Sequence, residues 1–69
     1  MEKKITIAID AMGGDNSPDK IIQGVNFFLE KNLKNNDFLL NLFGDEKKIK
    51  EKLIKYNISS NLIKIIHTE

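Results

Sequence analysis

Three short apolar runs alternate with two amphipathic stretches along the chain. The apolar runs are rich in isoleucine, leucine and phenylalanine and are bounded by polar or glycine residues, a pattern typical of β-strands. They cover Lys4–Asp10, Phe38–Phe43 and Leu62–Ile66. The sequence therefore predicts three strands of ordinary length.

The stretch between the first two strands has apolar residues at helical spacing, with Ile21, Val25 and Phe28 on one side. Ser17 is a suitable capping residue and Pro18 suits the first position of a helix. We therefore predict a helix that begins at Ser17-Pro18 and closes over residues 31–36. The Phe27-Phe28 pair is interpreted most simply as core.

The second amphipathic stretch predicts a helix over Glu46–Asn57. Ile49, Leu53 and Tyr56 would point inward and the charged residues outward. Gly44-Asp45 precedes this stretch, and we expect it to end the second strand and cap the helix.

This order of elements predicts the α/β fold class, as a βαβαβ unit of parallel strands with right-handed crossovers. If both crossovers step the same way, both helices cover one face of the sheet. The second strand is apolar on both faces, because Phe38, Leu40 and Leu42 alternate with Leu39 and Phe43. Parallel strands of this kind need cover on both faces. We expect the missing cover to come from residues beyond Glu69 or from another chain.

Size and composition exclude several classes of protein. The chain has 69 residues, enough for one small domain. It has no cysteine and one histidine, His67, which argues against disulfides, a cysteine acyl-enzyme and a Cys/His metal cluster. The net charge of +1 gives no electrostatic reason to expect nucleic acid as a partner. No apolar stretch has the length of a signal peptide or a membrane span, so we expect a cytoplasmic protein. We assign no residue of the chain to a metal site.

The most informative segment is the junction between the first strand and the first helix, Asp10–Pro18. A strand, a glycine turn and a helix start direct backbone N–H groups to one spot, which suits an anion. Such sites gather at the carboxyl ends of parallel strands. The Gly13-Gly14 pair could equally be only a turn. Because Asp10 and Asp15 are acidic and no lysine lies between Asp10 and Asp19, an anion here would depend on backbone donors or on basic groups from elsewhere.

The run Ile9-Asp10-Ala11-Met12-Gly13-Gly14-Asp15-Asn16-Ser17-Pro18 resembles the opening motif of the acyl carrier protein:phosphate acyltransferases. The similarity continues through Leu42–Asp45 and the Ile65–Glu69 region, although Glu69 follows His67 by two residues where that family has three. The resemblance covers essentially the whole chain but only about the first fifth of such an enzyme. It identifies residues 1–69 as the N-terminal βαβαβ portion of a larger α/β acyltransferase domain.

The resemblance implies a doubly wound fold similar to that of isocitrate and isopropylmalate dehydrogenases. It implies transfer of a fatty acyl group from acyl carrier protein to inorganic phosphate, giving acyl phosphate for phospholipid synthesis, with no cofactor. Phosphate attacks the thioester carbonyl, so positioning and oxyanion stabilisation are the main tasks of the protein. The 69-residue chain alone is expected to be inactive. A homodimer and peripheral membrane association are expected of the full-length protein, through segments outside this chain.

We assign candidate roles to six residues. Gly13 and Gly14 would supply backbone donors to phosphate or substrate, and Asp10 and Ser17 would line the same site. Asp10 could instead accept N–H groups of the loop, and Ser17 could simply cap the helix. Asp15 and His67 are the candidate catalytic residues. Asp15 would orient a neighbouring group or fix the loop, and His67 would transfer protons or be a half-exposed strand-end residue.

The lysines of the second predicted helix suggest one further contact surface, and two alternative classes of protein remain open. The cluster Lys47, Lys48, Lys50, Lys52 and Lys55 is typical of a solvated helix face and could also contact an acidic carrier protein. One alternative is a nucleotide- or anion-binding α/β module without catalytic activity, although Gly-x-Gly-x-x-Gly and a Walker lysine are absent. Another is a receiver-like interaction domain with Asp10 and Asp15 in an acidic pocket.

Overall fold

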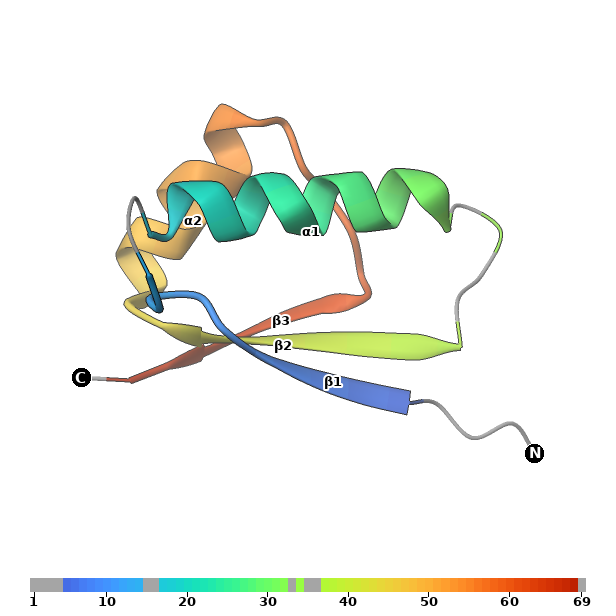
Figure 1. Cartoon of the computed structure of the whole chain (residues 1–69), viewed down its shortest axis with the longest axis horizontal. Coiled ribbons are helices and arrows are strands. Elements are labelled where there is room, and N and C mark those ends of the chain that lie inside the picture. The colour runs from blue at the N-terminus through green and yellow to red at the C-terminus, as the bar shows by residue number, and fades with distance from the viewer. Residues whose placement is uncertain (1–4, 15–16, 33, 35–36, 69) are drawn as a thin grey trace.

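The computed structural model describes residues 5–14, 17–32, 34 and 37–68. The order of elements is as predicted (Figure 1). The strands are β1 (Ile5–Asp10), β2 (Phe38–Gly44) and β3 (Ile63–His67), and the helices are α1 (Asp19–Lys31) and α2 (Glu46–Lys55). Lys4, where the first strand was expected to begin, lies outside the described residues, as do residues 33, 35 and 36 at the predicted end of the first helix.

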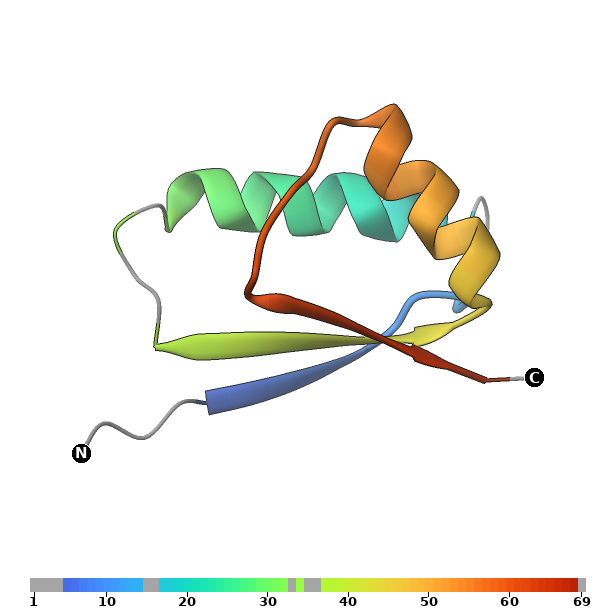
Figure 2. The same cartoon turned by 180° about the vertical axis from the view of Figure 1, so that it is seen from behind.

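The sheet is parallel, with β2 between β1 and β3. Both connections step in the same direction across the sheet, so α1 and α2 lie on the same face. Figures 1 and 2 show this from opposite sides, with both helices above the strands. The predicted two-layer βαβαβ unit is therefore confirmed.

The core lies between β2 and the two helices. Alternate residues of β2 are buried, because a strand directs successive side chains to opposite faces. The fully or nearly fully buried side chains come from the loop after β1, from both helices and from β2; they are Ala11, Ile22, Val25, Phe38, Leu40, Leu42 and Ile49. The helical spacing read from the sequence thus places Val25 and Ile49 correctly.

The second face of the sheet carries no element among the described residues. Leu39, Asn41 and Phe43 of β2 point to this side and are only half-buried. Ile66 of β3 lies beside Phe43 in the register and is also half-buried. The expectation of a second, uncovered apolar face is confirmed for these positions, with Asn41 as the polar exception.

The start of α1 differs from the sequence prediction. The helix begins at Asp19, with Pro18 as its N-cap, and no side chain caps it. The Ser17 hydroxyl instead donates a hydrogen bond to the Gly13 carbonyl. The prediction that Ser17 caps α1 was wrong, because the loop uses this hydroxyl to close on itself.

The end of α2 also differs, because the helix stops at Lys55 and not at Asn57. Asn57 adopts a left-handed conformation, with φ of 55°. Its N–H donates to the Ile54 carbonyl at 3.0 Å, and the Ile58 N–H donates to the Leu53 carbonyl at 2.8 Å. This pair of bonds is a Schellman motif, which terminates the helix two residues earlier than the hydrophobic spacing indicated.

Strand boundaries shift by one residue, and both members of the Phe27-Phe28 pair that was interpreted as core are exposed, Phe28 at 38%. β2 continues to Gly44, and β3 runs one residue later than predicted because His67 pairs with Gly44. Phe28 packs edge-on against Phe38, with ring centroids 5.1 Å apart. Phe27, by contrast, is 63% exposed and lies under the Lys31 ammonium group. The interpretation of Phe27 as core was therefore wrong, since it lies on the outer side of α1.

Candidate functional site

The loop after β1 folds around the Asp10 carboxyl group. The Met12 N–H donates to Asp10 Oδ1 at 3.0 Å, and the Gly13 N–H approaches the Asp10 carbonyl at 3.5 Å. The Ala11 N–H bonds to the Phe43 carbonyl at 2.9 Å, which ties the loop to β2. Asp10 therefore accepts loop N–H groups, as one of its two sequence-based interpretations proposed.

Gly13 and Gly14 are both exposed at the turn. Gly14 has φ of 86°, a conformation that glycine adopts without steric cost. A Cβ atom on Gly13 would lie 3.3 Å from Asp10 Oδ2, so the carboxyl group packs closely against this residue. Within the described part of the chain the Gly14 N–H meets no acceptor. Of the two glycines, Gly14 is thus the one with an amide left to offer to a ligand.

Gly44 at the end of β2 holds the other side of the loop. A Cβ atom on Gly44 would lie 2.5 Å from Met12 Cγ, closer than real side chains approach one another. The absence of a side chain here lets Met12 pack against the strand end. The loop is therefore positioned by the central strand as well as by β1.

His67 lies on β3 at the same carboxyl edge of the sheet. The Glu46 N–H donates to His67 Nδ1 at 3.1 Å, so the imidazole accepts a bond from the first residue of α2. Asp45 caps the same helix by accepting from the Lys48 N–H at 3.2 Å, as predicted. A neutral His67 with Nδ1 as acceptor carries its proton on Nε2. The Nε2–H is then available to donate a hydrogen bond to a ligand.

The structure brings some of the predicted site residues together and not others. Asp10, Gly13 and Ser17 are linked by hydrogen bonds within one loop. His67 is on β3, and β2 lies between it and the strand that carries Asp10, a spacing of about 10 Å for two strand intervals. Asp15 lies outside the described residues.

A second polar cluster joins the two helices around Asp19, which is the first residue of α1. The Tyr56 hydroxyl donates to the Asp19 carboxylate, at 2.7 Å from Oδ1, and Gln23 Nε2 donates to Oδ2 at 2.7 Å. Lys52 Nζ and Lys55 Nζ lie 3.2 Å and 3.5 Å from Asp19 Oδ1. We call this group the interhelical clamp.

Electrostatics in the clamp favour the charged form of the carboxyl group. The hydrogen bond from Tyr56 is the main cause that lowers the pKa of Asp19 from 3.8 to about 2; Gln23, Lys52 and Lys55 act in the same direction, against partial burial. The nearby Tyr56 phenol and the Asp19 carboxylate raise the pKa of Lys55. Near neutral pH Asp19 is therefore a carboxylate and Lys55 is protonated.

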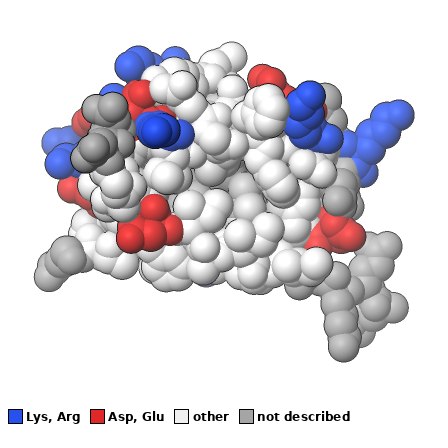
Figure 3. All heavy atoms as spheres, in the orientation of Figure 1, with Lys and Arg blue, Asp and Glu red and all other residues white. Residues whose placement is uncertain are grey.

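Beside the clamp lies a depression of about 560 Å³, which we call the basic hollow. Six residues line it: Ser17, Asp19, Lys20, Gln23, Lys52 and Lys55. Lysine and carboxylate groups gather at this end of the helix layer, over α2 and the start of α1 (Figure 3). Sequence analysis had included Lys52 and Lys55 in the lysine cluster of the second helix, but it did not connect them with Lys20 or Asp19, which lie on the first helix. The position of Lys52, Lys55 and Tyr56 on one flank of α2 was a further signal.

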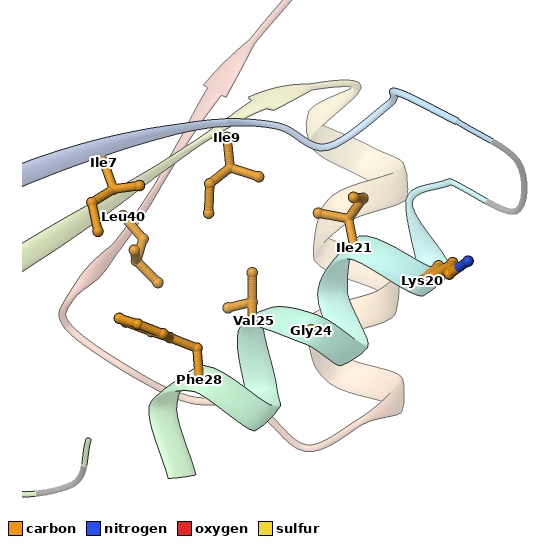
Figure 4. A pocket seen from close by; sticks show the side chains of 8 residues that line it. All are labelled: Ile7, Ile9, Lys20, Ile21, Gly24, Val25, Phe28 and Leu40. Carbon is orange, nitrogen blue, oxygen red and sulfur yellow. The ribbon is translucent and has the colours of Figure 1, made fainter. Parts of the chain in front are cut away.

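An apolar groove of about 450 Å³ runs between β1 and α1. Its lining is Ile7, Ile9, Lys20, Ile21, Gly24, Val25, Phe28 and Leu40. In Figure 4 the sheet residues and the apolar helix residues point toward one another across the groove, and the Lys20 ammonium group points away from them. Lys20 lines both the apolar groove and the basic hollow.

The described residues contain no group of three or more His, Cys, Asp or Glu side chains that could hold a metal ion. In the same part of the chain, neither helix has the length and apolar character needed to cross a bilayer. At the carboxyl edge, the described residues offer backbone amides, the carboxylates of Asp10 and Asp45, the hydroxyl of Ser17 and the imidazole of His67 for chemistry.

A protein-family match and the names of similar proteins agree on one family. A family described as "Fatty acid synthesis protein" matches residues 5–69. A protein of Pelagibacter ubique named "Phosphate acyltransferase" is 48% identical over 69 residues, all of this chain and 19% of that protein. Proteins of the same name from Streptococcus thermophilus and Streptococcus pyogenes are 44% and 46% identical over 63 residues, which are 91% of this chain and 17% of each relative. The chain spans about a fifth of the length of these relatives, and it belongs to the fatty acid synthesis protein family, whose members include enzymes named phosphate acyltransferase.

Proposed function

We propose that residues 1–69 are the N-terminal portion of an acyltransferase domain that transfers a fatty acyl group from acyl carrier protein to inorganic phosphate. The product, acyl phosphate, would serve phospholipid synthesis. The family match and the names of the relatives support this proposal. Because this chain covers about a fifth of each relative, the remaining catalytic groups would come from other parts of the enzyme.

One observation carries the proposal at the level of geometry. The exposed Gly13-Gly14 turn lies at the carboxyl edge of a parallel sheet and leaves the Gly14 N–H without an acceptor among the described residues. A fixed amide in this position can donate to a phosphate oxygen or to the oxyanion formed when phosphate attacks the thioester. Because the Asp10 carboxylate would repel an anion, its bond to Met12 has the useful effect of holding that charge within the loop.

The remaining candidates have separate roles in this proposal. The Ser17 hydroxyl closes the loop through Gly13 and lies beside the substrate. The His67 Nε2–H would donate a hydrogen bond to the substrate at this edge, and the imidazole would transfer a proton only if Nδ1 first releases the Glu46 N–H. Asp15 orients a neighbouring group in the same loop.

For the whole enzyme we propose the doubly wound fold of the isocitrate and isopropylmalate dehydrogenases. Both helices of this unit lie on one face of the sheet, and the half-buried Leu39, Phe43 and Ile66 lie on the other. A doubly wound sheet needs helices on both faces. The second layer would come from the rest of the polypeptide, which would also carry the dimer interface and any peripheral membrane contact.

A chimera tests the proposed function. This chain replaces the matching segment of the Pelagibacter ubique relative, and acyl phosphate formation is measured from acyl carrier protein thioester and inorganic phosphate. We expect turnover close to that of the intact relative. A folded chimera that binds ligand and forms no acyl phosphate would instead support the alternative, a binding module without catalytic activity.

Two substitutions in the chimera test the loop. Gly14→Val places a β-branched residue at a left-handed position and disturbs the amide, so we expect turnover to fall by about 100-fold, the cost of losing one oxyanion donor. Gly14→Asn is the matched control, since asparagine tolerates this conformation and keeps the amide in place. Equal turnover of the two variants, with equal melting temperatures, would remove the loop from the site.

A further inference from the structure

The basic hollow lies beside the candidate site and has no role in the proposed chemistry. Ser17 connects the two, because it lines the hollow while its hydroxyl bonds to the Gly13 carbonyl of the loop. A partner seated on the hollow would therefore lie next to the Gly13-Gly14 turn. This position is suitable for a molecule that delivers a substrate to the loop.

The charge of this surface is distinct from that of the rest of the chain. α2 contains five lysines and two glutamates, a net charge of +3, in a chain whose net charge is +1. Within the hollow, Asp19 offsets part of the charge of Lys52 and Lys55. Lys20 has no ion-pair partner among the described residues. The lining thus keeps an excess of positive charge.

The lysines of the hollow are better suited to binding the surface of another protein than to enclosing a small anion. The Lys55 side chain is 58% exposed, and that of Lys52 is 30% exposed. Lys52 and Lys55 project from α2 and Lys20 projects from α1. Their ammonium groups stay hydrated, a condition in which a single phosphate gains little. Several dispersed charges act together on an extended acidic surface, where they steer association and fix orientation.

We propose that the basic hollow, through Lys20, Lys52 and Lys55, docks an acidic face of the carrier protein that delivers the acyl thioester. This inference rests on the proposed function, and it assigns the partner's contact surface to α1 and α2. The clamp has a part in it, because Asp19 and Tyr56 hold the lysine-bearing end of α2 against the start of α1.

Charge changes in the chimera test the docking surface. The double variant Lys20→Glu/Lys55→Gln alters the hollow and leaves the Lys52–Asp19 ion pair in place. We expect the KM for acyl carrier protein to rise by about tenfold at low ionic strength, with kcat nearly unchanged and a weaker effect at high salt. Lys31→Glu at the far end of α1 is the control and should leave this KM within about twofold, because screening limits its reach.

Two further measurements separate the possible outcomes. With a neutral small donor, an acyl N-acetylcysteamine thioester, the double variant should match the parent chimera; an equal loss with this donor would overturn docking. A raised KM for inorganic phosphate with an unchanged KM for the carrier would show a small-anion site and also overturn it. If the chimera makes no acyl phosphate from either donor, the proposed function fails. Titration with acyl carrier protein still tests docking then, since loss of binding in the double variant supports it and unchanged binding contradicts it.

Discussion

Gly44 and Gly24 differ in the space around them, a difference that the sequence alone does not reveal. A Cβ atom at Gly44 would collide with Met12, whereas a Cβ atom at Gly24 would meet nothing within 4 Å. Gly24 lies inside α1 and weakens it by its backbone freedom. The effect of adding one methyl group should therefore have opposite signs at the two positions.

We expect Gly44→Ala to destabilise the fold by about 1–3 kcal/mol, the usual cost of overpacking. Gly24→Ala should stabilise it by about 0.5–1 kcal/mol, because alanine favours the helix. Urea unfolding of the chimera, followed by circular dichroism, measures both changes. If both variants were destabilised by the same amount, the close contact between Gly44 and Met12 would not be a feature of the folded protein.

Asn57 terminates α2 because its backbone adopts the left-handed conformation of the Schellman motif. Asn57→Ala should cost about 1 kcal/mol, because a left-handed alanine is strained. Asn57→Gly should retain or slightly increase stability. The same unfolding measurement checks this order, and a more stable alanine variant would contradict the Schellman assignment.

The residues that sequence analysis placed correctly are those whose role follows from periodicity or local capping. Val25 and Ile49 are buried at the predicted helical spacing, and Asp45 caps α2. The capping role predicted for Ser17 was wrong; its hydroxyl donates to the Gly13 carbonyl, which comes within reach only once the loop has folded. The clamp could not be predicted, since it needs the tertiary approach of Asp19 and Tyr56.

At the scale of elements, α1 and α2 are joined near their ends by the clamp, and its strength should depend on pH. Asp19 has a lower pKa folded than unfolded, so the folded state favours its ionised form. The stabilisation is then fully present above about pH 4 and is lost as the pH falls toward about 2. We expect the difference in free energy of unfolding between the parent chimera and its Asp19→Asn variant, measured by urea titration, to shrink over this interval. A difference that is constant between about pH 2 and about pH 6 would contradict this.

Removal of the Tyr56 hydroxyl tests the cause of the lowered pKa. Because the Tyr56 hydrogen bond is the largest cause, Tyr56→Phe should move the pKa of Asp19 back toward 3.8. Carboxyl chemical shifts in an NMR titration measure this directly. Lys50→Gln is the control, since Lys50 pairs with Glu46 outside the clamp and its loss should leave Asp19 unaffected.

Element order was predictable because strands and helices differ in hydrophobic period. That both crossovers step the same way was only a condition at the level of sequence, and the strand order β1-β2-β3 establishes it. Element ends were less predictable. α2 ended early because Asn57 adopts a left-handed conformation, and β3 extended to His67 because Gly44 offers it a pairing partner. Both ends depend on backbone hydrogen bonds that leave no periodic signal in the sequence.

At the scale of the whole molecule, the uncovered face of the sheet and the apolar groove leave much apolar surface in contact with water. We therefore expect the isolated 69-residue chain to be poorly folded or to self-associate. Sedimentation over a range of concentrations measures this. Leu39→Lys, on the open face, should reduce association, whereas Lys47→Arg is a control that leaves that face unchanged. A monodisperse monomer that melts cooperatively would contradict the expectation.

β1 is an edge strand of the sheet, and it can accept a further strand on its outer side. Its outer row of peptide groups faces away from β2, and residues 5–10 include neither proline nor lysine to discourage a neighbour. Any segment that added itself there as a fourth strand would end beside the Gly13-Gly14 turn if it ran parallel. Completion of the sheet and enclosure of one side of the candidate site would then occur in the same folding event.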